Sequence, residues 1–96
     1  MYQHIFGVMT EKEIVEEVLS HINMVDIADY ILSKEGFADI EVEKAKAVNC
    51  IGLALDSEDG YFEVGRYRCL CIRRDGKIVS LSLSFSETVS SYTYCE

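Results

Sequence analysis

An Asp-Gly dipeptide between two alternating runs constrains this chain more than any other feature of its sequence. Asp75-Gly76 separates RYRCLCIRR (66–74) from KIVSLSLSF (77–85). A two-residue hairpin turn needs positive φ at both central positions, and Asp-Gly is among the pairs that adopt it most readily. The pair therefore predicts an antiparallel ribbon in which Arg74 faces Lys77.

Counting outward from the turn predicts which side chains share a face of the ribbon. In a regular ladder Ile72 meets Val79 and Leu70 meets Leu81, and partners across a pair lie on one face. The core face is then expected to consist of Leu70, Ile72, Val79, Leu81, Leu83 and Phe85. The other face, a candidate interface, is expected to hold Tyr67, Cys69, Cys71 and Arg73. On the partner strand of the hairpin it is expected to hold Ile78, Ser80, Ser82, Ser84 and Ser86. A slip of one residue would exchange the two faces.

Two helices are predicted ahead of the ribbon. Thr10-Glu11-Lys12-Glu13 forms a capping box, in which each end residue bonds to the backbone amide of the other. The buried stripe of this helix is expected to be Ile14, Val15, Val18, Leu19 and Ile22. Asn23 is the predicted cap of a second helix, which would bury Val25, Ala28, Ile31 and Leu32. Gly36 is expected to end it, because glycine readily adopts the left-handed conformation.

The segment from Asp39 to Leu55 fits two structures. A helix capped by Asp39 is favoured over at least 40–48, because this stretch has strong helix formers. If helical throughout, it would bury Ile40, Ala47, Val48, Ile51 and Leu55. Residues 50–55, CIGLAL, also fit a buried strand, and both alternatives stay open. At the C-terminus, VSSYTYCE indicates a further strand.

These elements predict one α+β domain over residues 1–96, because a chain of this length is too short for two cores. Two or three N-terminal helices are expected to pack on a small antiparallel sheet built around the Asp75-Gly76 hairpin. Hydrophobic residues make up 49% of the chain, which is enough for a compact core. The order of elements also resembles a winged-helix arrangement, with 39–55 as the third helix and the hairpin as the wing.

Catalytic and metal motifs are missing from the sequence. Cys69 and Cys71 lie on one strand, but neither has a second knuckle of the kind that structural zinc sites use. His21 follows an apolar stripe, where packing is the expected role. No glycine-rich phosphate loop or nucleophile elbow occurs. We therefore expect no catalytic residues, no metal and no cofactor, and we expect that the protein is not an enzyme. A thiol-dependent or metal-dependent enzyme is the third hypothesis.

Charge is distributed unevenly along the chain. Residues 1–63 carry 14 acidic and 4 basic side chains, whereas residues 64–96 carry 3 acidic and 5 basic ones, for a net charge of −8. An acidic surface repels phosphate backbones and attracts basic partners, so we expect no direct binding of nucleic acid. The candidate partner-binding residues are Glu13, Glu16, Glu17, Asp26, Asp29, Glu41 and Glu43.

The predicted location is the cytoplasm, because the sequence shows neither a signal peptide nor a membrane helix. In size, acidity and lack of catalytic motifs the chain resembles small inhibitor proteins encoded by phages and mobile elements, including anti-CRISPR proteins. This resemblance assigns no residue roles. The first hypothesis is an inhibitor or adaptor that docks on a basic, nucleic-acid-binding surface of a larger protein. The alternative is a structural module that forms a homodimer through the ribbon or a sheet edge.

Overall fold

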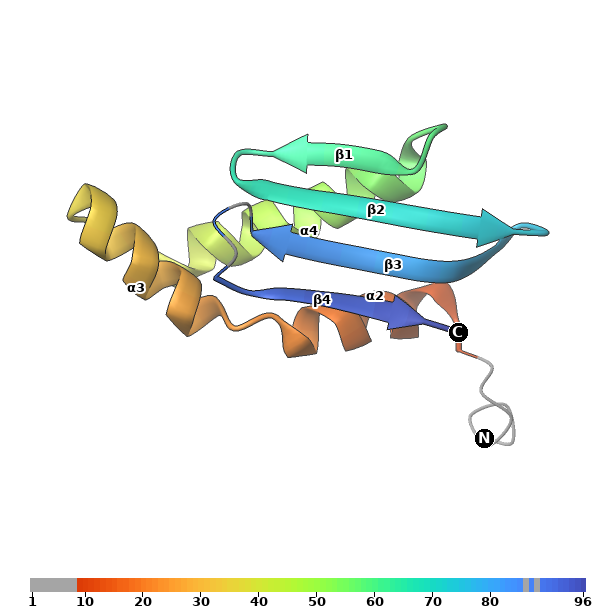
Figure 1. The fold of residues 1–96 in the computed structure, drawn as a ribbon, viewed down its shortest axis with the longest axis horizontal. Coiled ribbons are helices and arrows are strands. Elements are labelled where there is room, and N and C mark those ends of the chain that lie inside the picture. Colours follow the sequence, from red (N-terminus) through yellow and green to blue (C-terminus); the bar gives the residue numbers. More distant parts are fainter. Residues whose placement is uncertain (1–8, 86, 88) are drawn as a thin grey trace.

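Three helices cover one face of a four-stranded antiparallel sheet (Figure 1). The computed structural model describes residues 9–85, 87 and 89–96. The helices are α2 (Glu11–His21), α3 (Met24–Glu35) and α4 (Ile40–Asp56). The strands are β1 (Tyr61–Val64), β2 (Tyr67–Arg74), β3 (Lys77–Phe85) and β4 (Ser91–Cys95), and they lie in the sheet in chain order. The predicted α+β fold with N-terminal helices on a small sheet is confirmed.

Each helix begins at the cap that its sequence predicts. The Thr10 hydroxyl accepts from the Glu13 amide at 3.2 Å, and the Glu13 carboxylate accepts from the Thr10 amide at 2.8 Å. Asn23 caps α3 through the Asp26 amide, and Asp39 caps α4. Gly36 ends α3 in the left-handed conformation, with φ of 76°. These side chains satisfy backbone donors that a helix N-terminus leaves without partners.

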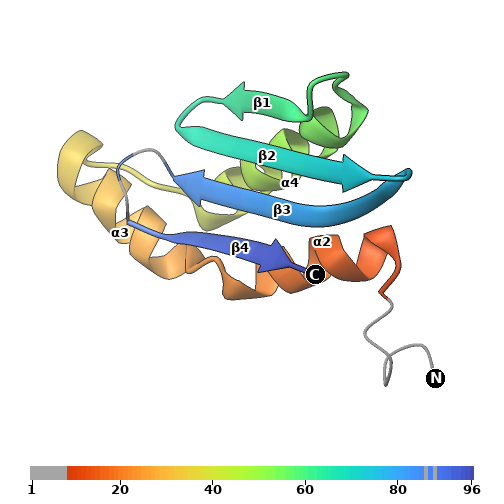
Figure 2. The same ribbon diagram turned by 45° about the vertical axis from the view of Figure 1, so that its right-hand side comes forward.

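Helix α4 continues through the segment whose sequence fits either a helix or a strand. It runs from Ile40 to Asp56, so residues 50–55 are helical. Its buried residues are Glu43, Ala47, Cys50, Ile51 and Ala54, which recur at the spacing of one helical face. Helix α4 packs against β1 and β2, and α2 packs against β3 and β4. Figure 2 shows both helices behind the sheet, while α3 extends past its end.

The hairpin turns at Asp75-Gly76 with positive φ at both residues, 54° and 77°, and Arg74 pairs with Lys77 as predicted. The next part of the ladder differs from the prediction. Arg73 pairs with Ile78, but Ile72 pairs with Ser80, so Val79 is an extra residue that has no partner on β2. This β-bulge puts two residues of β3 opposite one of β2 and moves every later pair by one position.

Because of the bulge, the predicted faces of β2 are exchanged. Cys71 is opposite Leu81 and Cys69 is opposite Leu83, and these side chains lie against the helices. Leu70 and Ile72 point to solvent instead, with 40% and 47% of their surfaces exposed. The predicted core positions Leu81, Leu83 and Phe85 are confirmed. The prediction that Leu70, Ile72 and Val79 lie in the core was wrong. The opposite face was predicted to hold Tyr67, Cys69, Cys71 and Ile78, and this was also wrong, because all four are buried. Ser86, predicted on that same face, lies outside the described residues.

The second face of the sheet is not covered by any described element. It carries Tyr61, Glu63, Arg68, Leu70 and Ile72 on β1 and β2, and hydroxyl residues on β3 and β4. The ribbon β2–β3 is the centre of the sheet and does not project as a separate wing.

The helix stripes are also corrected in part. The stripe of α2 is confirmed, since Ile14, Val18 and Ile22 are buried. In α3 the core is formed by Ile27, Ala28 and Ile31, so Val25 and Leu32 are exposed instead of buried. In α4, Val48 is likewise exposed, because the helix presents Glu43, Ala47 and Cys50 to the sheet. Ile40 shares the face of Ala47, but it is the first residue of the helix and is also exposed.

Candidate functional site

Four of the predicted acidic residues lie exposed on the helices. Glu16 is on α2, Asp26 and Asp29 are on α3, and Glu41 is in the first turn of α4. Of these, Glu41 has a cationic neighbour, the Lys44 ammonium at 3.7 Å, in a solvent-exposed pair. An exposed pair of this kind contributes little to stability, so these carboxylates are available to a partner. We call Glu16, Asp26, Asp29 and Glu41 the acidic helical surface.

The remaining three predicted acidic residues have contacts within the fold. Glu13 completes the capping box of α2. The Glu17 carboxylate accepts a hydrogen bond from the Tyr92 hydroxyl at 3.1 Å and lies 3.8 Å from the His21 ring nitrogen. The His21 ring also stacks on Tyr92, with ring centroids 4.0 Å apart. Glu17 and His21 therefore connect α2 to the edge strand β4.

Glu43 is buried, so its expected place on the surface was wrong. Only 6% of the residue is exposed, and its carboxylate accepts a hydrogen bond from the Tyr67 hydroxyl at 2.9 Å. Lys46 lies 3.3 Å from the other carboxylate oxygen. Burial and the neighbouring carboxylate raise the pKa of Tyr67 above its usual value. A buried charge is stabilised by such partners, so this cluster holds α4 on the sheet.

The candidate interface face lies inside the molecule. Tyr67, Cys69 and Cys71 are buried under the helices, and Tyr67 packs edge to face on Phe85 with centroids 5.3 Å apart. Arg73 reaches from the same face to the Glu11 carboxylate at 2.9 Å and to the Leu55 carbonyl at 3.3 Å. These four side chains hold helices on the sheet, and three of them are closed to a partner.

The buried thiols are poorly suited to catalysis or metal binding. Burial raises the pKa of the Cys69 thiol to about 12, and burial is also the main cause that raises the pKa of Cys50 and of Cys71. A thiolate is the reactive and metal-binding form of cysteine. All four cysteines are free, and Cys95 is the exposed one. Among the described residues, no three His, Cys, Asp or Glu side chains gather in a way that would hold a metal ion.

An open groove of about 730 Å³ lies between the α2–α3 turn and the first turn of α4. We call it the junction groove. Its lining includes Met24, Val25 and Ile40 as apolar side chains and Glu41 and Lys44 as charged ones. Val25 is 57% exposed, which is a large fraction for an aliphatic side chain within a helix. Asp26 follows Val25 directly, so the groove and the acidic helical surface adjoin.

The helical spacing of Val25 and Ile40 predicts that both are buried, but both are exposed. A signal existed in α4, since Glu43, Ala47, Cys50 and Ala54 share one helical face. That alternative stripe turns Val48 outward, whereas Ile40 lies on the same side as Ala47 and is exposed at the first position of the helix. The stripe contains a charged residue, so hydrophobicity alone does not favour it.

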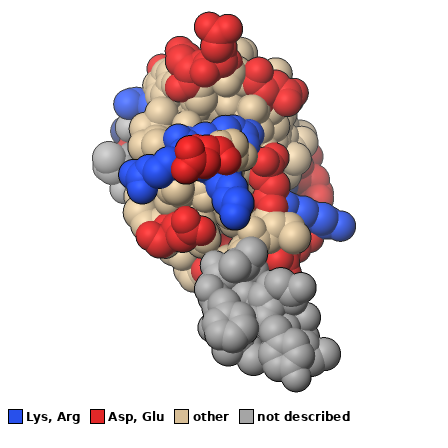
Figure 3. Space-filling view, turned by 90° about the vertical axis from the view of Figure 1, so that its right-hand side faces the viewer, with Lys and Arg blue, Asp and Glu red and all other residues tan. Residues whose placement is uncertain are grey.

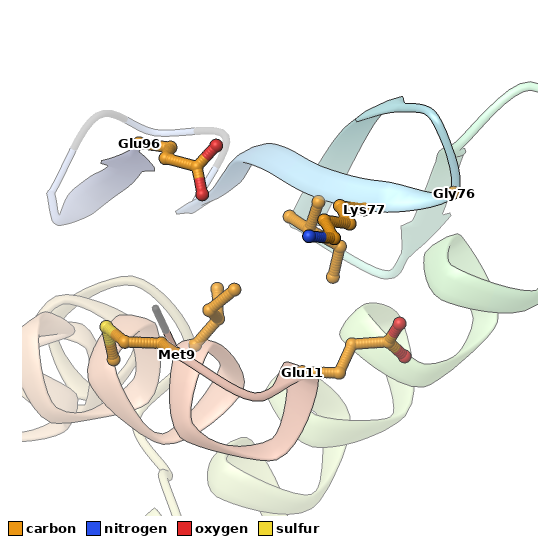
Figure 4. Close-up of a pocket in the computed structure, with 7 residues that line it drawn as sticks. Met9, Glu11, Gly76, Lys77 and Glu96 are labelled. Atoms are coloured by element: carbon orange, nitrogen blue, oxygen red, sulfur yellow. The ribbon is translucent and has the colours of Figure 1, made fainter. Parts of the chain in front are cut away.

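A smaller pocket of about 200 Å³ lies between the first turn of α2 and the start of β3. Figure 4 shows Lys77 between the carboxylates of Glu11 and Glu96, with Met9 on the near side of the helix. Ile14 and Ile78 supply the apolar part of its lining. Among the described residues, the lining includes no thiol, hydroxyl or imidazole side chain.

Basic side chains gather at the end of the molecule where the hairpin turns. Figure 3 views this end and shows Lys and Arg side chains together, with acidic ones among and around them. The cationic residues of the two strand ends are Arg73, Arg74 and Lys77, and Arg73 is already paired with Glu11. A mixed surface of this kind is a poor match for a phosphate backbone.

No helix within the described part of the chain is both long and apolar enough to cross a membrane. No protein-family model matches the chain, and neither the curated proteins nor the solved structures that were compared include a match.

Proposed function

We propose that this protein is a small protein-binding domain, and that it acts as an inhibitor by docking its helical side on a basic surface of a larger protein. The observation that carries the proposal is that exposed carboxylates and exposed aliphatic side chains adjoin at one place. Val25 and Ile40 border the junction groove, and Asp26 and Glu41 stand next to them. The residues of the acidic helical surface lie on three helices, and Glu41 also lines the groove.

An apolar centre with a polar rim is the usual anatomy of a protein interface. Desolvation of Val25 and Ile40 would supply affinity, and the carboxylates would select a partner that carries Lys or Arg around an apolar side chain. The expected partner surface is one that normally holds nucleic acid, because such a surface is basic. Direct binding of nucleic acid by this chain is disfavoured by its own charge.

The proposal also includes that the protein binds its partner without catalysing a reaction, and that it is located in the cytoplasm. Three thiols are buried with raised pKa values, and all four cysteines are free. Free thiols suit a reducing compartment, in which the protein would meet its partner.

Charge reversal on two exposed helical positions tests the proposal. Glu16→Lys with Asp29→Lys changes the charge of the acidic helical surface at solvent-exposed sites. The matched control is Glu58→Lys with Glu63→Lys, which makes the same change in net charge in the α4–β1 turn and on the open face of the sheet. Partners are captured from the native host with each variant and identified by mass spectrometry, and their affinities are then measured at low and high salt.

The helical variant is expected to lose about tenfold in affinity at low salt, and the control to keep most of it. High salt should weaken the wild-type complex because it screens the carboxylates. Equal affinity of the helical variant and the wild type, at low salt, would remove the acidic helical surface from the mechanism.

A further inference from the structure

Strand β4 forms one edge of the sheet, and its outward backbone groups can be assigned from two hydrogen bonds (Figure 1). The Phe85 amide donates to the Ser90 carbonyl, and the Glu96 amide donates to the Val79 carbonyl, both at 3.0 Å. In an antiparallel ladder, hydrogen-bonded and non-hydrogen-bonded pairs alternate. The backbone groups of Tyr92 and Tyr94 therefore face β3, and those of Ser91, Thr93 and Cys95 face outward.

Within residues 9–85, 87 and 89–96, this edge lacks the features by which proteins prevent strand pairing. Residues 89–95, VSSYTYC, contain no proline and no charged residue. Tyr and Thr are strong strand formers. The ladder between β3 and β4 has no bulge, and among the described residues no further strand pairs with β4. Edges that avoid pairing usually carry a lysine, a proline or a bulge, or lie under another element.

We propose that β4 is a self-association edge, which pairs antiparallel with β4 of a second copy around a two-fold axis at Thr93. The outward groups of Thr93 then bond to Thr93 of the second copy, and those of Ser91 bond to Cys95 of the second copy. The two sheets become one continuous sheet. This inference goes beyond the proposed function, because it uses the sheet edge and not the acidic helical surface.

The side chains match in this register. Tyr92 lies opposite Tyr94 of the second copy, on the helix side and in a non-hydrogen-bonded pair, where cross-strand side chains are closest. Aromatic pairs across strands are favourable. On the open side Thr93 meets Thr93, and Ser91 meets Cys95. No cross-strand pair between the two copies of β4 brings like charges directly opposite each other. A second copy therefore fits this edge.

The association is expected to be weak and to grow stronger with salt. A strand of five residues forms a small interface. Each copy carries a net charge of −8, and Glu17 lies beside Tyr92 close to the edge. Salt screens the repulsion between the copies. This salt response is opposite to the one expected for docking on a basic partner. The failure of one proposal can therefore be distinguished from the failure of the other.

The first test is sedimentation equilibrium of the purified protein at about 10 to 500 µM and at two salt concentrations. A monomer–dimer equilibrium that shifts toward dimer in salt is expected. Thr93→Pro removes an outward N–H and leaves the β3–β4 ladder intact, because that N–H does not face β3. Thr93→Val is the matched control, since both variants lose the hydrogen bond from the Thr93 hydroxyl to Ser82.

Thr93→Pro is expected to weaken dimerisation by about tenfold or more, and Thr93→Val to leave it within about threefold. Circular dichroism establishes that both variants are folded. A wild-type protein that remains monomeric over the whole range would overturn the proposal. A dimer that persists in folded Thr93→Pro would also overturn it, because the contact would then lie elsewhere.

The second test measures the register. Ser91→Cys places a thiol opposite Cys95 of the second copy, at a Cα separation that a disulfide can bridge. Ser84→Cys is the control, because Ser84 is on β3, one strand further from the edge. Under mild oxidation Ser91→Cys should form covalent dimers on non-reducing gels well above the level of the control. Equal yields from both variants would contradict the register.

Discussion

The hydrogen bond between Tyr67 and Glu43 offers the sharpest test of how α4 is held on the sheet. Tyr67→Phe removes the hydroxyl that donates to the Glu43 carboxylate at 2.9 Å. The ring and its edge-to-face packing on Phe85 are retained, so little packing is lost. Glu43 stays buried and keeps the partly exposed Lys46 as a partner at 3.3 Å.

The expected loss in the free energy of unfolding is about 1.5 to 3 kcal/mol, since a hydrogen bond to a charged group is removed and a buried acceptor loses its partner. The free energy of unfolding of a domain is typically about 5 to 15 kcal/mol, so this loss is a large part of it. With a urea m-value of about 1 to 2 kcal/mol/M, the midpoint should fall by about 1 M or more. Urea titrations followed by circular dichroism measure the change.

Two further variants separate this contact from a general effect of removing hydroxyls. A double-mutant cycle with Glu43→Gln should give a coupling free energy of about 0.5 kcal/mol or more. Tyr94→Phe is the control, because within the described part of the chain the Tyr94 hydroxyl makes no hydrogen bond. A Tyr67→Phe protein as stable as Tyr94→Phe would refute the reasoning, since the buried carboxylate would then not need this donor.

The packing leads to three further predictions. Gly60→Ala should cost more than about 2 kcal/mol, because a Cβ there lies 2.1 Å from a β2 carbonyl oxygen at φ +74°. Gly65→Ala, at φ +58° in open space, should cost about 1 kcal/mol; equal losses in thermal melts would contradict the clash. Above pH 9 the Cys69 thiol loses its proton in the unfolded state but keeps it in the folded state, because burial raises its pKa in the folded protein from 9.0 to about 12. The free energy of unfolding should therefore fall as pH rises through this window, by about 1.4 kcal/mol per pH unit for this thiol. Urea titrations at about pH 8 and about pH 10 should show a shallower fall for Cys69→Ala, and an unchanged fall would argue against a buried thiol. Leu70→Ser on the open face should stay within about 0.5 kcal/mol of the wild type, whereas Leu81→Ala should cost about 2 to 5 kcal/mol; similar costs in denaturant unfolding would mean that the faces are misassigned.

The elements of the fold could be predicted because their signals are local. Thr10, Asn23 and Asp39 each cap the helix that was expected to follow them. Asp75-Gly76 supplies the positive φ values that the hairpin turn requires. Each signal depends on a few neighbouring residues and their backbone preferences, and no distant contact overrides it.

The faces of β2 could not be predicted from hydrophobicity, because this strand has apolar residues at successive positions on both sides. Leu70 and Ile72 are more hydrophobic than Cys69 and Cys71, so the pattern favoured the wrong side. A single extra residue, Val79, decides the outcome. The available signal was the spacing of three between the buried residues Ile78 and Leu81, which departs from strict alternation and indicates a bulge.

Only part of the candidate site could be predicted from the sequence, because the rest depends on tertiary contacts. Acidic composition points to carboxylates on a surface, but which of them the fold uses depends on tertiary contacts. Glu43 meets Tyr67 from a strand 24 residues away in sequence, and Glu17 meets Tyr92 from 75 residues away. Such contacts appear only once the helices are placed on the sheet. The groove beside Val25 likewise depends on how α3 and α4 meet.

The orientation of the sheet underlies every surface described above, and counting reactive thiols tests it most directly. The native protein is treated with a thiol-specific reagent such as DTNB, and the fast-reacting thiols are counted before and after denaturation. With Cys95 exposed and Cys50, Cys69 and Cys71 buried, one fast thiol per native chain and four in denaturant are expected. Three fast thiols in the native protein would mean that Cys69 and Cys71 face solvent, and would contradict the bulged register.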